Sequence, residues 1–323
     1  MTLSPRTALL SHWAKQPWLW SFFGALGVYG LVLVFARGHG AWNVLTTALA
    51  FSAFTVLVGI GQMFVITLGP GNIDLSLPAT IGFASAVAMK VMDGADSRIV
   101  LGLAAAVGAG WAIGTLNYLL IRLLRIPPLI ATLSSSFVIR SVGISYGRGL
   151  QIVPPPGFAY LTTARIGGIS LLALLVLAFS AIAALLVKRT VYGRSVLAIG
   201  QNMRAARLAG IPVGRVRWLT YTLCGGLGGL CGAFLAGFTG GSSLDVGAEY
   251  LLTSIAVVVI GGTSVAGGMA NVPGLWGGAL MLFMTSTLLN ASGLGVGARD
   301  LFTGLIIITV ITLAGGMRQA RQG

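Results

Sequence analysis

Residues 188–217 read KRTVYGRSVLAIGQNMRAARLAGIPVGRVR, and they form the long polar segment of a chain that is otherwise a series of apolar runs. We call this stretch the basic segment, because it holds seven Lys and Arg residues and no Asp or Glu. Loops between membrane spans that carry an excess of Lys and Arg stay on the cytoplasmic side. The basic segment is therefore expected to face the cytoplasm and to orient the spans on either side of it.

The composition of the whole chain indicates a lipid environment. Hydrophobic residues make up 56% of the 323 residues, charged residues only 8%, and the mean hydropathy is +0.94. Because so few charges cannot solvate a globule of this size, we expect an integral membrane protein with the lipid bilayer as its partner. The formal net charge is +14, but the basic residues lie between apolar runs rather than on one polar face. They are interpreted as orientation signals, and no nucleic-acid partner is expected.

The apolar runs predict an all-α, polytopic membrane helix bundle that forms a single domain over residues 1–323. A helix needs about 20 apolar residues to cross a bilayer. By that length we predict ten spans, at residues 18–35, 44–68, 77–92, 99–124, 126–147, 169–187, 219–238, 250–267, 273–290 and 301–316. The fifth is the weakest, since three consecutive serines and Arg140 interrupt it.

The distribution of charge favours an even number of spans with both termini in the cytoplasm. In that topology the inner side carries thirteen Lys and Arg residues and no acid, as the preference for positive inner loops requires. The outer side carries most of the acids, Asp245 and Glu249 among them. Only Asp74 and Arg140 are left at membrane depth.

Glycine, at 48 residues, is the second organising feature. Gly110 and Gly114 in the fourth span, and the five glycines between positions 225 and 232 in the seventh, have the spacing that lets helix backbones approach closely. Residues 69–78 and 261–273 contain too much Gly and Pro for continuous helix, and each joins two predicted spans. We expect an internal repeat in which these two breaks face a common path.

The middle of the basic segment is predicted to form a short helix that can dock another protein. Asn202 can cap the start of this helix, and Met203, Ala206 and Ala209 recur at helical spacing. Gly210, with a proline two residues later, ends it.

Asp74 is the most deeply placed acid, and a carboxylate inside a membrane suggests a functional role. The competing interpretation, which we favour, is that Asp74 or Ser76 caps the third span and folds the loop, with Pro78 in the first helical turn. Asn72 is adjacent and takes the same interpretation.

Arg140 could line a polar pathway with Ser136 and Ser141, or its long side chain could extend to the outer surface. The sequence favours neither alternative. Asn117 in the fourth span and Asn290 at the end of the ninth could hydrogen-bond a solute, although bonds between helices are the commoner use of such residues.

Several functions are excluded by what the sequence lacks. It has no Gly-x-x-x-x-Gly-Lys-Ser/Thr motif, so it cannot be its own P-loop ATPase. It has no series of Asp, Glu and His residues for a proton relay and no nucleophile with a base at recognisable spacing, so an enzyme is not expected. Neither His has a Cys or carboxylate at metal-ligand spacing, and no metal or other cofactor is predicted. Uphill transport would need free energy from another chain, delivered through the basic segment.

Four motifs stand in a recognisable order. They are Gly-Asn-Ile-Asp-Leu-Ser at 71–76, Arg-Ile-Pro-Pro-Leu-Ile-Ala-Thr-Leu at 125–133, Tyr-Gly-Arg-Ser at 192–195 and Ala-Ala-Arg-Leu-Ala-Gly-Ile at 205–211. In this order they resemble the permease subunits of ribose-type bacterial ABC importers, over nearly the whole chain. The resemblance implies a core of two permeases in the inner membrane, identical or paralogous, with a pair of cytoplasmic ATPase subunits. It also implies a periplasmic solute-binding protein that hands over a monosaccharide.

By that resemblance the ATPase pair would grip the stretch near 200–211 as a coupling helix and drive the spans through alternating access. The residues implied in this contact are Gly200, Asn202, Arg204, Ala205, Ala206, Arg207 and Gly210. Two departures from the family pattern stand out. Asn72 replaces one of a pair of glycines, and Met203-Arg204 stand where the coupling stretch commonly has an acid. The ATPase partner is therefore expected to offer an acidic groove.

Other functions stay open at this point. A permease for branched-chain amino acids or nucleosides is the close alternative, although Ile-Asp-Leu-Ser at 73–76 leans toward sugars. An ATP-independent facilitator or channel, and a structural membrane scaffold, are the alternatives from other classes.

Overall fold

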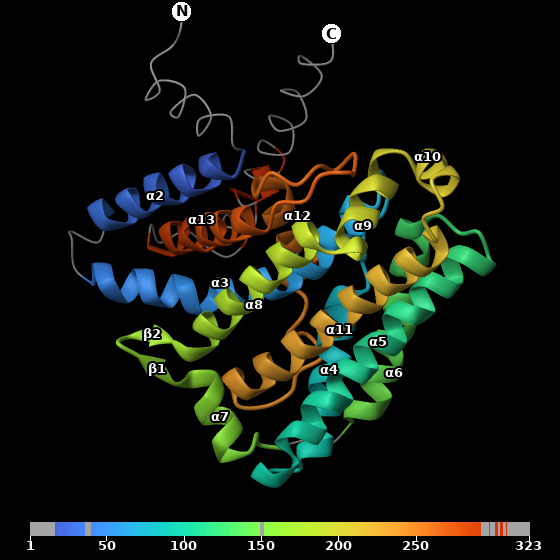
Figure 1. Cartoon of the computed structure of the whole chain (residues 1–323). Helices are drawn as coiled ribbons and strands as arrows, with labels where there is room; N and C mark the ends of the chain where they lie inside the picture. The colour runs from blue at the N-terminus through green and yellow to red at the C-terminus, as the bar shows by residue number, and fades with distance from the viewer. Residues whose placement is uncertain are drawn as a thin grey trace, which may run out of the picture.

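The computed structural model of the chain describes residues 17–35, 40–148 and 152–291, with the isolated positions 297, 301–302, 304–305 and 308. Most of the predicted tenth span lies outside the described residues, as do the basic residues expected near both termini. The described part is a bundle of α-helices with one short hairpin (Figure 1). Its helices are α2 (Pro17–Phe35), α3 (Ala41–Thr67), α4 (Leu77–Met92), α5 (Ile99–Leu123), α6 (Pro128–Gly147), α7 (Pro156–Thr163), α8 (Leu171–Arg189), α9 (Val191–Gln201), α10 (Met203–Leu208), α11 (Val213–Thr239), α12 (Tyr250–Ile260) and α13 (Val272–Ala291), with a 3₁₀ turn η1 (Asp96–Arg98) before α5.

The predicted spans agree closely with the observed helices. In the described part, six helices are long and apolar enough to cross a membrane: α3, α5 together with η1, α6, α8, α11 and α13. The helical membrane bundle predicted from the sequence is therefore confirmed. Between α6 and α8 the sequence analysis missed α7 and the antiparallel hairpin of β1 (Arg165–Ile166) and β2 (Ile169–Ser170).

Two of the helices that were predicted as spans, α4 and α12, are too short to cross a bilayer by themselves. α4 has 16 residues and α12 has 11, and at 1.5 Å per residue they extend about 24 Å and 17 Å, against a hydrocarbon layer of about 30 Å. The predicted eighth span, 250–267, is wrong in its second half, because the helix ends at Ile260. Gly262 follows with a φ of 87°, in a left-handed conformation that a continuing helix does not allow.

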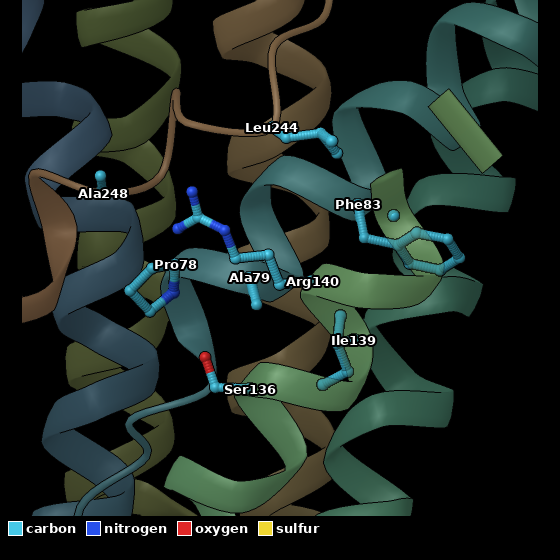
Figure 2. Close-up of a pocket in the computed structure, with 9 residues that line it drawn as sticks. Pro78, Ala79, Phe83, Ser136, Ile139, Arg140, Leu244 and Ala248 are labelled. Carbon is cyan, nitrogen blue, oxygen red and sulfur yellow. The ribbon is translucent and has the colours of Figure 1, made fainter. Parts of the chain in front are cut away.

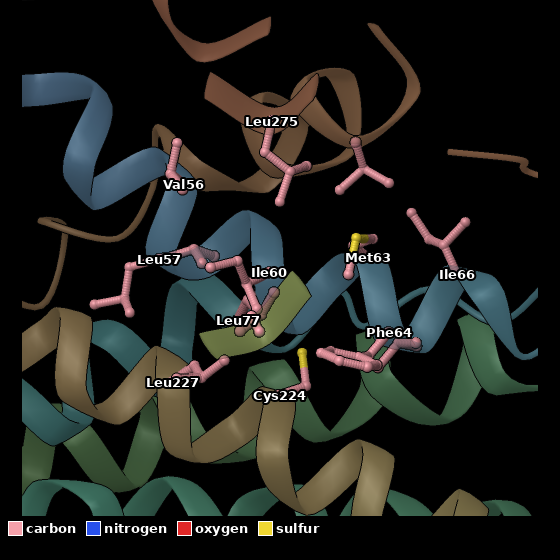
Figure 3. Close-up of a cluster of buried hydrophobic side chains, with 14 of the residues drawn as sticks. Val56, Leu57, Ile60, Met63, Phe64, Ile66, Leu77, Cys224, Leu227 and Leu275 are labelled. Carbon is pink, nitrogen blue, oxygen red and sulfur yellow. The ribbon is translucent and has the colours of Figure 1, made fainter. Parts of the chain in front are cut away.

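The centre of the bundle is formed by α3 and α11. In the most apolar window of each helix, 83% of residues are buried in α3 and 72% in α11, against 28% in α5 and α6. Figure 3 shows Ile60 and Met63 of α3 packed between Leu227 of α11 and Leu275 of α13. A helix that is apolar all round belongs in such a centre, whereas the outer helices turn one apolar side away from it.

α5 and α11 pack backbone to backbone. A Cβ atom added at Gly110 would lie 2.0 Å from the carbonyl oxygen of Gly225, and one at Gly114 would lie 2.2 Å from that of Tyr221. Further along, a Cβ at Gly229 would lie 2.2 Å from the carbonyl oxygen of Ala106. The predicted small-residue packing is therefore confirmed, and the two glycine-rich helices are each other's partners.

The segment between α11 and α12, residues 240–249, does not stay at the ends of the helices. It lies along the first half of α4, where a Cβ at Gly82 would be 2.4 Å from the carbonyl oxygen of Leu244. A Cβ at Gly247 would be 2.2 Å from the carbonyl oxygen of Pro78. In this segment Asp245 reaches Arg140 of α6, and the two side chains form an ion pair of 2.7 Å.

We predict that Gly110→Ala destabilises the protein by about 1–3 kcal/mol, because the new methyl group forces α5 away from α11. Gly108→Ala is the matched control, since a Cβ there meets nothing within 4 Å. Thermal unfolding of the purified chain in detergent, followed by tryptophan fluorescence, measures both. Equal midpoints for the Gly110→Ala variant and the unmodified chain would contradict the packing.

Candidate functional site

The basic segment is largely helical and extends past one end of the bundle (Figure 1). The Thr190 hydroxyl caps α9 by accepting a hydrogen bond from the backbone N–H of Gly193 at 3.0 Å. The predicted short helix is present as α10. Asn202 caps it as expected, since its Oδ1 accepts from the backbone N–H groups of Arg204 and Ala205, both at 3.0 Å. Gly210 follows the helix with a φ of 81°.

α10 presents a mixed basic and apolar face to its surroundings. Ala206 is buried against the bundle, whereas Arg204, Ala205 and Arg207 are exposed. Leu208 is 90% exposed, the highest value among the large exposed apolar side chains of the described part. Neither arginine of α10 forms an ion pair within the part of the chain that the structure describes. An exposed leucine that follows two exposed arginines on one short helix has the chemistry of a docking surface.

Gly200, near the end of α9, lies at a junction with both helix breaks. A Cβ at Gly200 would be 1.9 Å from the carbonyl oxygen of Thr67 and 2.3 Å from the backbone nitrogen of Gly268. The breaks also touch each other: the Gly268 N–H donates to the Thr67 carbonyl at 2.9 Å, and a Cβ at Gly267 would be 2.4 Å from the Cα of Gly69. We call this contact the glycine junction. It joins the basic segment to both breaks mainly through backbone atoms, and the Gln201 side chain adds a hydrogen bond to the carbonyl of Gly268 at 3.5 Å.

The break before α4 is held by buried polar side chains. Asp74 Oδ1 accepts hydrogen bonds from the backbone N–H of Ser76 at 2.9 Å and from its hydroxyl at 2.6 Å. Asn117 of α5 donates through Nδ2 to Ser76 Oγ at 2.8 Å, and its Oδ1 accepts from the hydroxyl of Ser135 on α6. Asp74, Ser76 and Asn117 are at most 3% exposed. The loop-folding role predicted for Asp74 is observed, whereas Ser76 stands at the N-cap position of α4 without a capping bond from its side chain.

Asn72 connects the same break to α11. Its Oδ1 accepts from the Tyr221 hydroxyl at 3.1 Å and from Nη2 of Arg217 at 3.4 Å. Its Nδ2 donates to the carbonyl of Gly69 at 3.1 Å. Asn72 therefore lies between the glycine junction and the Asp74 network.

Sequence reasoning missed two further members of this network. Gln62 of α3 accepts the backbone N–H of Asp74 through Oε1 at 3.3 Å, and Thr132 of α6 accepts the N–H of Leu75 at 3.1 Å. Gln62 is fully buried, and it is a long polar side chain within the apolar run 44–68, which is the signal that could have revealed it. Asp74 Oδ2, Gln62 Nε2 and Nε of Arg217 are buried without a hydrogen-bond partner in the described part.

Arg140 lies at a hollow beside the beginning of α4, which Figure 2 shows in close-up. Pro78, Ala79, Phe83, Ser136, Leu244 and Ala248 are among the residues that surround it. Arg140 and Ser136, which one of the two alternatives grouped together, thus line the same hollow. Ser141 does not line the hollow, and its hydroxyl donates to the carbonyl of Phe137 at 2.9 Å. Asn290 is exposed near the end of α13.

The chemistry available in these places is that of binding and positioning. In the described part, no three His, Cys, Asp or Glu side chains come together in a group that could hold a metal ion. Cys224 and Cys231 are free, buried thiols in α11.

Three similar proteins are all named as permease proteins of import systems or ABC transporters. The autoinducer 2 import system permease protein LsrC of Enterobacter sp. (strain 638) is 31% identical over 308 residues, which cover 95% of this chain and 89% of the relative. The ribose import permease protein RbsC of Bacillus subtilis (strain 168) is 34% identical over 266 residues, 81% of each chain. The L-arabinose ABC transporter permease protein AraH of Azospirillum brasilense is 34% identical over 236 residues, 70% of this chain and 66% of the relative.

No solved structure matches the chain. The family model described as branched-chain amino acid transport system / permease component matches residues 44–311, which include both helix breaks and the basic segment. The chain therefore belongs to this family of transport-system permease components.

Proposed function

We propose that the chain is the transmembrane subunit of an ABC importer that moves a monosaccharide or sugar-like solute across the bacterial inner membrane. The solute class is supported by relatives that are named for autoinducer 2, L-arabinose and ribose import. Branched-chain amino acids, which the family description names, are the second candidate. ATP is hydrolysed in a separate subunit, and the solute passes by alternating access.

The observation that carries the proposal is the glycine junction. A facilitator or channel has no need for a stiff link between an exposed basic helix and two breaks inside the bundle. In this chain, Gly200 contacts Thr67 and Gly268 without an intervening side chain. A push on α10 is therefore passed to both breaks, which is how an external ATPase would move the spans.

The proposed topology has ten spans, with both termini in the cytoplasm and residues 1–323 forming one domain. The contacts support the direction of the described spans, because the ends of α3 and α9 and the break after α12 meet at one place, as inward-facing ends would. With the basic segment beside them, this end of the bundle carries the positive charge expected on the cytoplasmic side.

α10 is the proposed docking site for the ATPase subunits. Arg204 and Arg207 supply charge for an acidic groove, Ala205 allows close approach, and Leu208 supplies the apolar anchor. The helix is capped at its start by Asn202, packs against the bundle through Ala206, and is followed by Gly210 in a left-handed conformation. A second permease copy, identical or paralogous, and a periplasmic solute-binding protein complete the proposed importer.

The pathway residues are proposed to have two roles. Asn72, Asp74, Ser76 and Asn117 shape the break before α4, because their hydrogen bonds are made with the chain itself. Arg140 is the proposed contact with the solute, because its side chain faces a hollow.

Proteoliposomes test the function directly. The complex with its ATPase should accumulate a sugar only when ATP is present, and Gly200→Ala should abolish accumulation while the ATPase still co-purifies. The reason is that a methyl group at 1.9 Å from the Thr67 carbonyl breaks the glycine junction but leaves the exposed face of α10 intact. Gly108→Ala is the control. Accumulation of the sugar without ATP would contradict the proposed importer function. Full accumulation by the Gly200→Ala variant would contradict the proposed role of the glycine junction.

Reversing charge on α10 tests the docking surface. We expect Arg204→Glu to weaken co-purification of the ATPase at least about tenfold, because like charges placed opposite each other cost several kcal/mol. Arg165→Glu is the control, since Arg165 is equally exposed but lies in β1. Unchanged co-purification of the Arg204→Glu variant would show that the partner binds elsewhere.

Asp74 is tested by a matched pair of substitutions. Asp74→Ala leaves the N–H of Ser76 unpaired and should cost about 1–3 kcal/mol of stability. Asp74→Asn keeps an acceptor at Oδ1 and should retain most of both stability and uptake. Thermal unfolding and sugar uptake are measured on both variants. A stable Asp74→Asn variant that has lost uptake would mean that the carboxylate charge acts on the solute pathway.

A further inference from the structure

The segment 240–249 closes one side of the hollow at Arg140. It follows α11 and precedes α12, and it runs beside the first turns of α4. The Leu244 side chain reaches α6, where a Cβ at Gly143 would lie 3.0 Å from Leu244 Cδ2. The segment therefore contacts both α4 and α6 along their length, rather than only at their ends.

One ion pair ties this segment to α6. Arg140 Nη2 donates to Asp245 Oδ1 at 2.7 Å, and the two side chains are 56% and 71% exposed. In Figure 2 the Arg140 guanidinium lies across the hollow, with Ser136 and Pro78 on one side and Ala248 on the other. The pair is therefore a bridge between two elements of the hollow.

The position of Arg140 in the helix suits a hollow that is open to water or polar solute. Arg140 lies well inside α6, which begins at Pro128 and ends at Gly147, about 18 Å from the first residue of the helix. A cation at such a depth is costly unless it faces a polar cavity or the bundle interior. The exposed side chains in the middle of α8, Leu174, Leu177 and Ile182 among them, are apolar, as lipid contact requires.

The other groups at the hollow suit a polyhydroxylated solute. A guanidinium offers several donors, a carboxylate several acceptors, and a sugar hydroxyl can bond to either. The Ser136 hydroxyl lines the same hollow. The Phe83 ring, held edge to face against Tyr146 with centroids 5.7 Å apart, supplies an apolar surface for the face of a sugar ring.

We propose that the Arg140–Asp245 pair is a gate on the solute path that also binds the solute. The pair closes the hollow when the path is empty. When segment 240–249 moves away from α6, the two side chains exchange their mutual hydrogen bond for bonds to solute hydroxyls. This proposal rests on the function proposed above and adds Asp245, Ser136 and Phe83 to the residues that select the solute.

The fold links this gate to the glycine junction. α12 has 11 residues, follows the segment that carries Asp245, and leads at Ile260 into the break that contains Gly267 and Gly268. A movement at the break is passed along this short helix to the segment at its other end. The gate therefore opens when the junction moves.

The test uses Asp245→Asn, which keeps the shape of the side chain and removes its charge. Proteoliposomes that contain the importer complex are loaded with ribose, and passive efflux is measured without ATP. ATP-driven uptake is then measured over a range of ribose concentrations. We expect passive efflux to rise at least about fivefold, and the KM for uptake to rise about tenfold, because a charge-assisted hydrogen bond is lost.

The second ion pair of the described part provides the control. Asp93 and Arg98 are paired at 3.5 Å with side chains 63% and 55% exposed, at the turn between α4 and α5. Asp93→Asn should change neither efflux nor KM. The exchanged double variant Arg140→Asp/Asp245→Arg should restore low efflux while KM stays raised, which a merely structural pair would not produce.

The outcomes separate the gate from the function on which it rests. Failure of the unmodified complex to accumulate ribose or L-arabinose with ATP would contradict the proposed solute class. The efflux comparison is then made with a branched-chain amino acid, the second candidate solute, in place of ribose, and still decides the gate. Efflux and KM of Asp245→Asn equal to those of the unmodified complex would overturn the gate alone. Should Asp245→Asn unfold in detergent, Arg140→Gln, which also removes one charge of the pair, is measured in its place, with the same expected rise in efflux and the same contrary result.

Discussion

The structure depends on the pairing of backbone groups where helices are interrupted inside the bundle. Lipid offers no hydrogen bonds, so a helix that starts or stops at membrane depth must find partners within the protein. At the break before α4 these partners are side chains: Gln62 accepts from Asp74, Thr132 from Leu75 and Asp74 from Ser76. At the break after α12 they are mostly backbone groups, including the carbonyl of Thr67 for the N–H of Gly268. The polar residues in otherwise apolar spans are explained by these interruptions.

The need to pair buried polar groups distinguishes the two polar regions near α4, the Asp74 network and the hollow at Arg140. The Asp74 network is buried and its bonds are made with the chain, so it holds the break in shape and offers little to a solute. The hollow at Arg140 has exposed charges that face one another across two elements. The break before α4 is therefore held by buried bonds to α3, α5 and α6, whereas the hollow beside α4 and segment 240–249 is open to binding.

Much of the fold could be predicted from the sequence, and the failures have a common cause. Hydropathy located the long helices, glycine spacing indicated the pairing of α5 with α11, and local capping rules placed α10. The predicted break at 261–273 begins where α12 ends, and only the predicted eighth span, drawn on to Gly267, ran past that end. The partners of Asn72 were missed because Tyr221 is 149 positions away. The pair of Arg140 with Asp245 was missed because the two residues are 105 positions apart.

The glycine junction explains how a chain without an ATPase motif can be driven from outside. Packed backbone is stiffer than interdigitated side chains, which can change rotamer and absorb a displacement. Gly200 lies so close to Thr67 and Gly268 that no Cβ would fit between them. A movement of α9 is therefore passed on to both residues, because no side chain lies between them that could change rotamer and absorb it. Each break lies next to a half-length helix, α4 on one side and α12 on the other. One displacement at a single glycine thus reaches α4, which lines the hollow, and α12, which follows the lining segment 240–249, so that the two half-length helices can move together.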